Sequence, residues 1–319
     1  MSIKTRKVVI IGSGNVGSHC AFSLALQGIC DEIVMIDKIE KKANAEAVDL
    51  SDTVSYLPHC VKIRKGTFED CSDADIIVVS LGVPPEKDKS RLDFLEGTIK
   101  EVDTIIDPIL KSGFDGIIVV ISNPVDVVSD YILKKTGFPK NKVFGSGTTL
   151  DSLRLRRILS QETGIDAKSV QGYTMGEHGD SQMVPWSHVY LGGKPLMQLI
   201  EENPKIFGKL DLDELEKRTA FAAYEIIEGK GCTEFGIGVG LSQIVKTILH
   251  DEKNIMQATT LLNGEYGQNN VFASVPVIMG KDGVEEIIEI NLTNIEKEKF
   301  NNSCNVIRSY IEKCKEINK

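Results

Sequence analysis

The stretch Val8-Val9-Ile10-Ile11-Gly12-Ser13-Gly14-Asn15-Val16-Gly17 is a short apolar run followed at once by a GxGxxG pattern. The apolar run predicts a buried β-strand, and the glycines predict a tight turn into a helix over residues 15–27. In such a unit the second glycine lets the backbone approach a pyrophosphate, and the third lets the helix pack on the strand. The phosphates would lie against free amides at the helix N-terminus. The stretch therefore predicts a dinucleotide-binding unit.

An acidic residue follows at the position where a dinucleotide site needs one. The next apolar run, Ile33–Ile36, ends in Asp37, twenty residues after Gly17. A carboxylate there accepts hydrogen bonds from ribose hydroxyls and repels a 2′-phosphate, which favours NAD over NADP; a flavin in place of nicotinamide also fits the pattern at this step. The expected cofactor contacts are Gly12, Gly14, Asn15, Val16, Gly17, Asp37, Gly82, Ser122 and Asn123.

The first half of the chain continues this alternation of strand and helix. Nearly continuous apolar runs at Ile76–Val79 and Ile117–Ile121 are typical of parallel strands covered on both faces. Helical stretches over residues 15–27, 40–56 and 92–111 lie between the apolar runs. The pattern predicts an α/β fold, a doubly wound parallel sheet of the Rossmann type, over residues 1–146.

The second half has a different pattern, which predicts a mixed α+β substrate domain over residues 147–319. Helices are expected over 149–162, 212–228 and 233–250, and strands over 255–262 and 271–279, with a further strand after the turn at Lys281–Gly283. The chain ends in a helix with an apolar stripe that predicts a core-facing side. No linker rich in proline or serine separates the halves, so we expect them to share an interface.

Composition excludes several classes of partner. The 319 residues include 46 acidic and 37 basic side chains, a net charge of −9 that argues against nucleic acid or an anionic membrane as the main partner. We find no apolar run near the roughly 18 residues of a membrane span and no signal-peptide pattern. The seven cysteines form no CxxC pair, so we expect no metal site, and reduced thiols in a cytoplasmic protein.

Three groups of residues downstream carry candidate chemistry. Asn123, in Ser122-Asn123-Pro124, follows a predicted strand, and the carboxyl ends of such strands bind ligands. Asp151 and Arg154 are three residues apart in a predicted helix and share a face. His178 stands between glycines in Gly176-Glu177-His178-Gly179-Asp180. Taken singly, each also fits an ordinary role as a turn, a surface ion pair or a loop histidine.

Taken together, these segments resemble the L-lactate/malate dehydrogenase superfamily, and bacterial L-lactate dehydrogenases in particular. The resemblance runs from about residue 7 to the C-terminal helix. It is carried by Gly12–Gly17, Asp37, Ser90-Arg91, Ser122-Asn123-Pro124-Val125-Asp126, Thr136-Gly137-Phe138-Pro139, Gly145-Ser146-Gly147-Thr148-Thr149-Leu150-Asp151 and Gly176–Ser181. It implies an NAD-dependent L-2-hydroxyacid dehydrogenase that interconverts L-lactate and pyruvate by hydride transfer.

The resemblance also assigns catalytic roles. His178 resembles the family's acid/base histidine, and Asp151 its carboxylate partner. Arg154 resembles the arginine that binds the substrate carboxylate, and Arg91 the loop arginine that polarises the carbonyl.

Further assignments concern the substrate pocket. Asn123 resembles the asparagine that hydrogen-bonds the same oxygen, and its bond to Pro124 is expected to be cis. Thr233 resembles a threonine that lines the substrate pocket, and Cys232 beside it should border that pocket. The partners implied are a small 2-oxo or 2-hydroxy acid and further copies of the chain, as a dimer or tetramer.

The chain departs from the family pattern at two positions. The residue that discriminates substrates, six before Arg91, is Pro85; lactate enzymes usually have Gln there and malate enzymes Arg. Pro85 counts against malate and leaves an L-2-hydroxyisocaproate dehydrogenase open; a malate dehydrogenase also stays open, because Lys87 or Lys89 could supply the cation. Arg156 resembles an arginine that binds fructose 1,6-bisphosphate at a subunit interface, but the histidine expected with it is Gln171. We therefore expect weak activation at most.

Two functions of other classes fit the sequence less well than an oxidoreductase. A nucleotide-binding regulator without catalysis would be expected to lack one of the catalytic residues, and all of them are present. An NAD-dependent glycosidase would need a metal pair of cysteine or histidine, which the sequence does not offer.

Overall fold

The computed structural model describes residues 5–83 and 91–317, without the side chains of residues 91–93 and 315–317. Its main strands are β1 (Lys7–Ile11), β2 (Glu32–Ile36), β3 (Lys62–Lys65), β4 (Ile76–Val79), β5 (Ile117–Val120), β6 (Val143–Gly145), β10 (Asn254–Asn263), β11 (Asn269–Gly280) and β12 (Gly283–Ile287). They form one sheet in the order β12-β11-β10-β6-β5-β4-β1-β2-β3. Strands β1 to β6 are parallel, in the order typical of a dinucleotide-binding fold.

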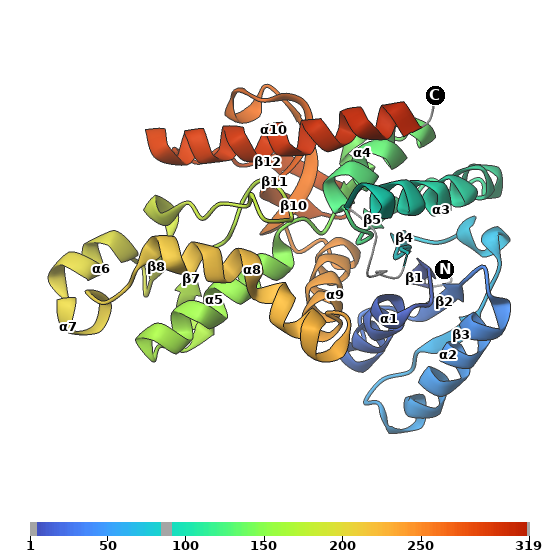
Figure 1. Ribbon diagram of the computed structural model, residues 1–319. Helices are drawn as coiled ribbons and strands as arrows, with labels where there is room; N and C mark the ends of the chain where they lie inside the picture. Colours follow the sequence, from blue (N-terminus) through green and yellow to red (C-terminus); the bar gives the residue numbers. More distant parts are fainter. Residues whose placement is uncertain (1–4, 84–90, 318–319) are drawn as a thin grey trace.

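The helices are α1 (Asn15–Gln27), α2 (Glu40–Thr53), α3 (Arg91–Ser112), α4 (Val125–Thr136), α5 (Thr149–Thr163), α6 (Leu196–Glu202), α7 (Pro204–Phe207), α8 (Leu212–Lys230), α9 (Phe235–Leu249) and α10 (Asn294–Ile317). Helices α3, α4 and α10 lie on one face of the sheet, and α1 and α9 on the other (Figure 1). The prediction of a doubly wound parallel sheet is confirmed.

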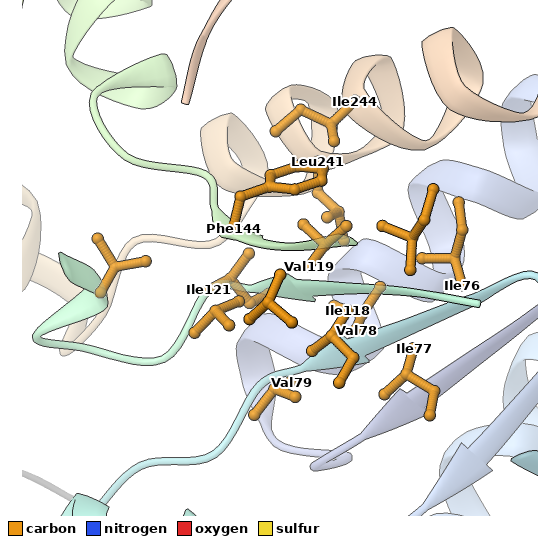
Figure 2. Packing of buried hydrophobic residues seen from close by; sticks show 14 of the residues in the cluster. Ile76, Ile77, Val78, Val79, Ile118, Val119, Ile121, Phe144, Leu241 and Ile244 are labelled. Atoms are coloured by element: carbon orange, nitrogen blue, oxygen red, sulfur yellow. The ribbon is translucent and has the colours of Figure 1, made fainter. Parts of the chain in front are cut away.

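Aliphatic side chains fill the space between sheet and helices. Every residue of β4 and β5 is buried, as expected for strands covered on both faces. Figure 2 shows Leu241 and Ile244 of α9 directed towards the sheet, next to Phe144 of β6. This packing holds the carboxyl ends of β4, β5 and β6 in fixed positions, and polar residues follow those ends.

The edge strand β3 was not predicted. Its sequence is Lys-Ile-Arg-Lys, and Ile63 is its single buried residue. An edge strand has one unpaired side and a largely solvated face, so it needs no continuous apolar run. The sequence pattern for buried strands therefore passes over it, although β3 pairs with β2 in parallel.

The sheet continues across the predicted domain boundary at residues 146/147. Strand β10 pairs antiparallel with β6 through Thr259 and Gly145, and β11 and β12 extend the sheet beyond it. The strands predicted at 255–262 and 271–279 are confirmed, but their place beside the parallel strands was not anticipated. The interface expected between the halves is therefore a shared sheet.

A smaller layer lies beside the main sheet and contacts it through α5. It contains α5, α6, α7, α8 and the short antiparallel sheet of β7 (Val170–Gln171), β8 (Tyr190–Leu191) and β9 (Lys194–Pro195). A separate apolar cluster that includes Leu155, Trp186 and Leu215 holds these elements together. Helix α8 packs against α5, and α5 in turn contacts β10 of the main sheet. Among the described residues, no helix has the length and hydropathy to span a membrane.

Candidate functional site

The glycine loop after β1 has the shape that its sequence predicts. Gly12 has a φ of +103°, and a Cβ on it would lie 2.2 Å from the Ser80 carbonyl oxygen. A Cβ on Gly17 would lie 1.9 Å from the Gly12 carbonyl oxygen, so helix α1 can start here only with glycine. Gly14 faces open space, where the nearest atom to its Cβ position is Lys42 Nζ at 4.0 Å. The open side at Gly14 leaves room for a phosphate.

The first turn of α1 is free of side-chain capping, because its N-cap is Gly14. Its first amides have no acceptor within the helix and point out of the loop, as in other anion sites at helix N-termini. Asp37, at the end of β2, is held beside this loop: Oδ2 accepts from the Ser13 amide at 2.8 Å, and Oδ1 accepts from the Ile39 amide at 2.9 Å. An open phosphate cradle with an oriented carboxylate next to it fits a dinucleotide.

The next two strand ends are tied together by Ser122. Its hydroxyl accepts from the Leu81 amide at 2.7 Å and donates to the Val79 carbonyl at 3.2 Å. Gly82 follows Leu81 in the chain, so Gly82, Ser122 and Asn123 all lie at the carboxyl edge of β4 and β5. The Asn123–Pro124 peptide bond is cis, as the resemblance implied.

The acid–base group of the site is built around Asp151. Asp151 is in the first turn of α5 and is 1% exposed. Its Oδ2 is 2.5 Å from His178 Nδ1, and its Oδ1 accepts from Arg154 Nη1 at 2.8 Å. The spacing of three residues places Asp151 and Arg154 on one helix face, and the loop from β7 brings His178 to them. One buried carboxylate thus contacts both an imidazole and a guanidinium.

The charges of this group stabilise each other. Burial lowers the pKa of His178, but the Asp151 carboxylate and its hydrogen bond outweigh burial, so the pKa is raised from its ordinary value. Burial raises the pKa of Asp151, but His178 and Arg154 outweigh it, and the pKa is lowered. The pair is therefore imidazolium with carboxylate over a wider pH range than free histidine allows. Because Asp151 engages Nδ1, Nε2 remains for proton exchange.

A cavity of about 390 Å³ opens above this group. Asn123, Asp151, Arg154, His178 and Thr233 all line it, so the structure brings together these five predicted residues. The cavity thus extends from Asn123 and Thr233, on the side of the dinucleotide loop, to the acid–base group of Asp151 and His178. An oxygen-bearing substrate with a carboxylate can meet an imidazole, an amide and a guanidinium in one place.

Part of the cavity wall was missed in the sequence. Helix α8 contributes Ala220, Ala223, Tyr224 and Ile227, and Phe94 of α3 and Tyr310 of α10 also line the cavity. The α8 residues recur at intervals of three, one and three, which marks one helix face. That pattern was visible, but small apolar residues at helical spacing are more often core than substrate pocket.

Thr233 lies in a loop, although a helix was predicted to begin there. Helix α8 ends at Lys230 and is followed by Gly231, which has a φ of +88°, and helix α9 starts only at Phe235. The residues between them form a loop. Cys232 is half-buried next to Thr233, and Asn15 Nδ2 of α1 is 3.4 Å from its sulfur. The loop therefore connects the dinucleotide helix to the cavity wall at Thr233, whereas Cys232 is not among the residues that line the cavity.

Three predicted residues are not placed in this cluster by the described part of the structure. Pro85 lies outside the described residues, and Arg91 begins α3 but its side chain lies outside them. Arg156 lines a different cavity, of about 330 Å³, and its Nε donates to the Gly172 carbonyl at 3.1 Å. Gln171, in place of the expected histidine, is exposed on β7.

Comparison with known families agrees with this geometry. Residues 6–145 match the lactate/malate dehydrogenase NAD-binding domain, and residues 148–318 match the α/β C-terminal domain of the same family. The chain belongs to the lactate/malate dehydrogenase family. The resemblance predicted from the sequence is thereby confirmed, and so is NAD as the cofactor of this family's N-terminal domain.

Individual members of the lactate/malate dehydrogenase family are similar over their full length. The chain is 45% identical to L-lactate dehydrogenase of Fusobacterium nucleatum, covering 97% of each chain. It is 44% identical to L-lactate dehydrogenase 3 of Bacillus anthracis, covering 98% of this chain and 99% of the relative. The minor L-lactate dehydrogenase of Enterococcus mundtii, solved with ligands bound, superposes with a TM-score of 0.94 at 39% identity, covering 97% of this chain and 98% of that one.

Proposed function

We propose that this chain is an NAD-dependent L-lactate dehydrogenase that interconverts L-lactate and pyruvate. The observation that carries the proposal is the contact of one buried carboxylate, Asp151, with His178 and Arg154 in a single cavity. The full-length similarity to L-lactate dehydrogenases supports the choice of lactate. The test is kcat/KM with pyruvate, oxaloacetate, 2-oxoisocaproate and phenylpyruvate; a preference for one of the last three would overturn lactate.

Arg154 binds the substrate carboxylate in this proposal. Its guanidinium donates one N–H to Asp151 and lines the cavity with the rest, and its Nε has no hydrogen-bond partner among the described residues. A planar guanidinium matches a planar carboxylate and can donate two parallel hydrogen bonds. This contact fixes which end of the substrate lies near α5 and leaves the C2 oxygen to face His178.

His178 moves the proton. When bound, the nicotinamide of NAD accepts or donates the hydride. In lactate oxidation the neutral ring takes the hydroxyl proton at Nε2, and in pyruvate reduction the imidazolium returns it. Asp151 holds the ring through Nδ1 and stabilises the charged form, which is required for reduction.

The remaining roles follow from position. Asn123 donates a hydrogen bond to the C2 oxygen, and Thr233 forms the wall beside it. We assign to Arg91 the polarisation of the same oxygen, on the strength of the family resemblance. Gly12, Gly14, Asn15, Val16, Gly17 and Gly82 with Ser122 form the dinucleotide contacts.

Asp37→Ala should weaken NADH binding by at least about tenfold, since hydrogen bonds to charged groups contribute about 1.5–3 kcal/mol each. It should also reduce the preference for NADH over NADPH, because the charge that repels a 2′-phosphate is gone. The dissociation constants of both cofactors, measured by fluorescence, check this. Asp37→Asn is the comparison variant, because it removes the charge and keeps one oxygen, which can replace the acceptor of either the Ser13 or the Ile39 amide. An unchanged affinity and preference in both variants would refute the ribose contact.

Pro85→Arg should raise kcat/KM for oxaloacetate relative to pyruvate by at least about tenfold, because the family discriminates substrates at this position and a cation there pairs with a second carboxylate. Pro84→Arg, with the same charge one residue away, is the control. The prediction fails if the wild type already prefers oxaloacetate, or if the ratio is unchanged in a folded variant. A change in kcat at a constant ratio would instead indicate an effect on loop closure.

We also propose that the chain forms a homo-oligomer, a dimer or tetramer. Exposed apolar side chains gather on neighbouring helices, with Leu26 on α1, Val48 on α2, and Phe235 and Val239 on α9. Light scattering coupled to gel filtration tests this. The seven cysteines form no disulfide among the described residues, which supports a cytoplasmic location. The separate family matches support a division into residues 1–146 and 147–319.

We propose, finally, that fructose 1,6-bisphosphate activates this enzyme weakly at most. Arg156 already donates Nε to a backbone carbonyl, and the second cation expected near it is replaced by Gln171. Activity measured at subsaturating pyruvate with and without the bisphosphate decides the question.

A further inference from the structure

A second buried carboxylate contacts the catalytic loop from the sheet side. Asp126, the second residue of α4, is 2% exposed, and its Oδ2 accepts the backbone N–H of His178 at 2.9 Å. Asp151 contacts the ring of His178 and Asp126 contacts its backbone. The histidine therefore has two buried carboxylates as neighbours, one on α5 and one on α4.

The pKa of Asp126 is set by burial and by groups on the neighbouring loop and on β10. Burial raises the pKa of Asp126 to about 6, and Glu177 in the same loop acts in the same direction. The Thr259 hydroxyl on β10 and the amide and ring of His178 act against burial and lower it. From α10, Cys304 is near enough for Asp126 to raise the pKa of its thiol.

The remaining acid on α4 is paired elsewhere. Asp130, one turn later, is 4% exposed and accepts from Lys134 Nζ at 2.6 Å. Among the described residues, the cationic group that lowers the pKa of Asp126 is the imidazolium of His178, and the two groups favour each other's ionised forms.

A backbone amide alone does not require a carboxylate. A neutral oxygen would accept the same hydrogen bond without the cost of burying a charge. A buried carboxylate next to an imidazole has a second effect, because it favours the protonated ring. This electrostatic effect is what distinguishes Asp126 from an ordinary loop anchor.

We propose that Asp126 is a positioning residue for the reaction: its buried charge, held at the backbone N–H of His178, adds to that of Asp151 in stabilising the protonated ring and so sets the pH range of pyruvate reduction. This role rests on the proposed function, since it assumes that His178 exchanges the substrate proton. Asp126 acts through His178 and does not itself line the cavity.

Asp126→Asn tests the charge while keeping an acceptor for the His178 amide. The pKa of His178 should fall, so the alkaline limb of kcat/KM for pyruvate reduction should move to lower pH by at least about half a unit. The acid limb of lactate oxidation should move in the same direction, because oxidation needs the neutral ring. At high pH, reduction should be slower by roughly threefold to tenfold, with NADH affinity unchanged. General structural damage would lower the rates of both reactions, but it would not shift the pH dependence of reduction and of oxidation in the same direction.

A readout without substrate or cofactor separates this proposal from the proposed function. Diethylpyrocarbonate modifies neutral imidazole, so the pH dependence of His178 modification, followed by mass spectrometry of its peptide, should move to lower pH in Asp126→Asn. The exposed His250 is the internal reference. Asp130→Asn, a buried aspartate on the same helix, is the matched control and should move neither the limbs nor the modification profile.

Unmoved limbs and an unmoved modification profile in folded Asp126→Asn would overturn the proposal and leave Asp126 as a hydrogen-bond acceptor only. If that variant does not fold, Thr259→Val decides: loss of the hydroxyl that lowers the pKa of Asp126 should move the His178 profile in the same direction by a smaller amount. An enzyme without activity towards pyruvate or lactate would overturn the proposed function instead, and the modification profile would still decide the role of Asp126.

Discussion

Replacing His178 with asparagine should lower kcat for pyruvate reduction by about 10²–10⁴-fold, the usual contribution of general acid–base catalysis. Asparagine fills a similar volume and can donate to Asp151, but it has no titratable nitrogen at the position of Nε2. The Asp151–Arg154 contact at 2.8 Å does not involve the ring and should persist. Steady-state kinetics and the NADH dissociation constant, which should change little, check the prediction together.

His188→Asn is the matched control for this variant. His188 ends the 3₁₀ helix Trp186–His188 and bonds to Ser187 outside the cavity, so its loss should leave turnover intact. Near-normal kcat in His178→Asn would refute the catalytic role, and a large loss in His188→Asn would indicate that imidazole replacement acts through stability.

The pH dependence of the wild type follows from the same group. Because the pKa of His178 is raised, the protonated ring persists above the ordinary titration range of histidine. Pyruvate reduction, which needs the proton, should be retained up to this raised pKa and fall above it. The rate of lactate oxidation, which needs the neutral ring, should instead rise as the pH increases through the same pKa. Both limbs should be absent from the residual activity of His178→Asn.

The dinucleotide half of the site was predictable because its chemistry is local. The glycine pattern lies within six residues directly after a buried strand, the Gly17–Gly12 contact is local, and Asp37 ends the next apolar run. Hydrophobic patterning likewise gave β4 and β5, whose residues are all buried. Where a structural requirement lies within a short stretch of the chain, the residue types in that stretch are enough to predict it.

The catalytic half was predictable only in part from the residues themselves. The three-residue spacing places Asp151 and Arg154 on one face, but the arrival of His178 from 27 residues away came from the family resemblance. The contact between Asp126 and the His178 backbone could not be predicted, since it joins the start of α4 to a loop 52 residues later. Long-range contacts of this kind leave no periodic signal.

Strand order in the sheet and the residues of the cavity wall could not be predicted from the sequence for the same reason. The pairing of Thr259 with Gly145 joins β10 to β6, and neither strand's sequence specifies that partner. Ala220 and Ala223 line the cavity because α8 packs against α5, whose Asp151 and Arg154 form part of the same wall. The packing of whole elements decides such positions, and the residues at them are ordinary.

Arg154→Lys should lower kcat/KM for pyruvate by at least about tenfold, or about 1.4 kcal/mol. Lysine keeps the positive charge but has a single ammonium, which cannot form the paired hydrogen bonds of a guanidinium with a carboxylate. Arg154 also donates Nη1 to Asp151 at 2.8 Å, so the replacement must choose between Asp151 and the substrate. The loss should fall mainly on KM, with NADH affinity unchanged.

Arg157→Lys on the same helix provides the comparison, because Arg157 is exposed and contacts Gln161 rather than the cavity. Binding of oxamate, a carboxylate analogue of pyruvate, to the NADH complex separates the substrate contact from any change in turnover. If lysine at position 154 kept Asp151 as its partner, oxamate binding would weaken. The pH at which pyruvate reduction declines, which is set by the pKa of His178, would then stay the same. If lysine turned to the substrate, Asp151 would lose a partner, its charge would act more strongly on His178, and the limb would move to higher pH. Unchanged kcat/KM and oxamate affinity would mean that the carboxylate is held by another residue.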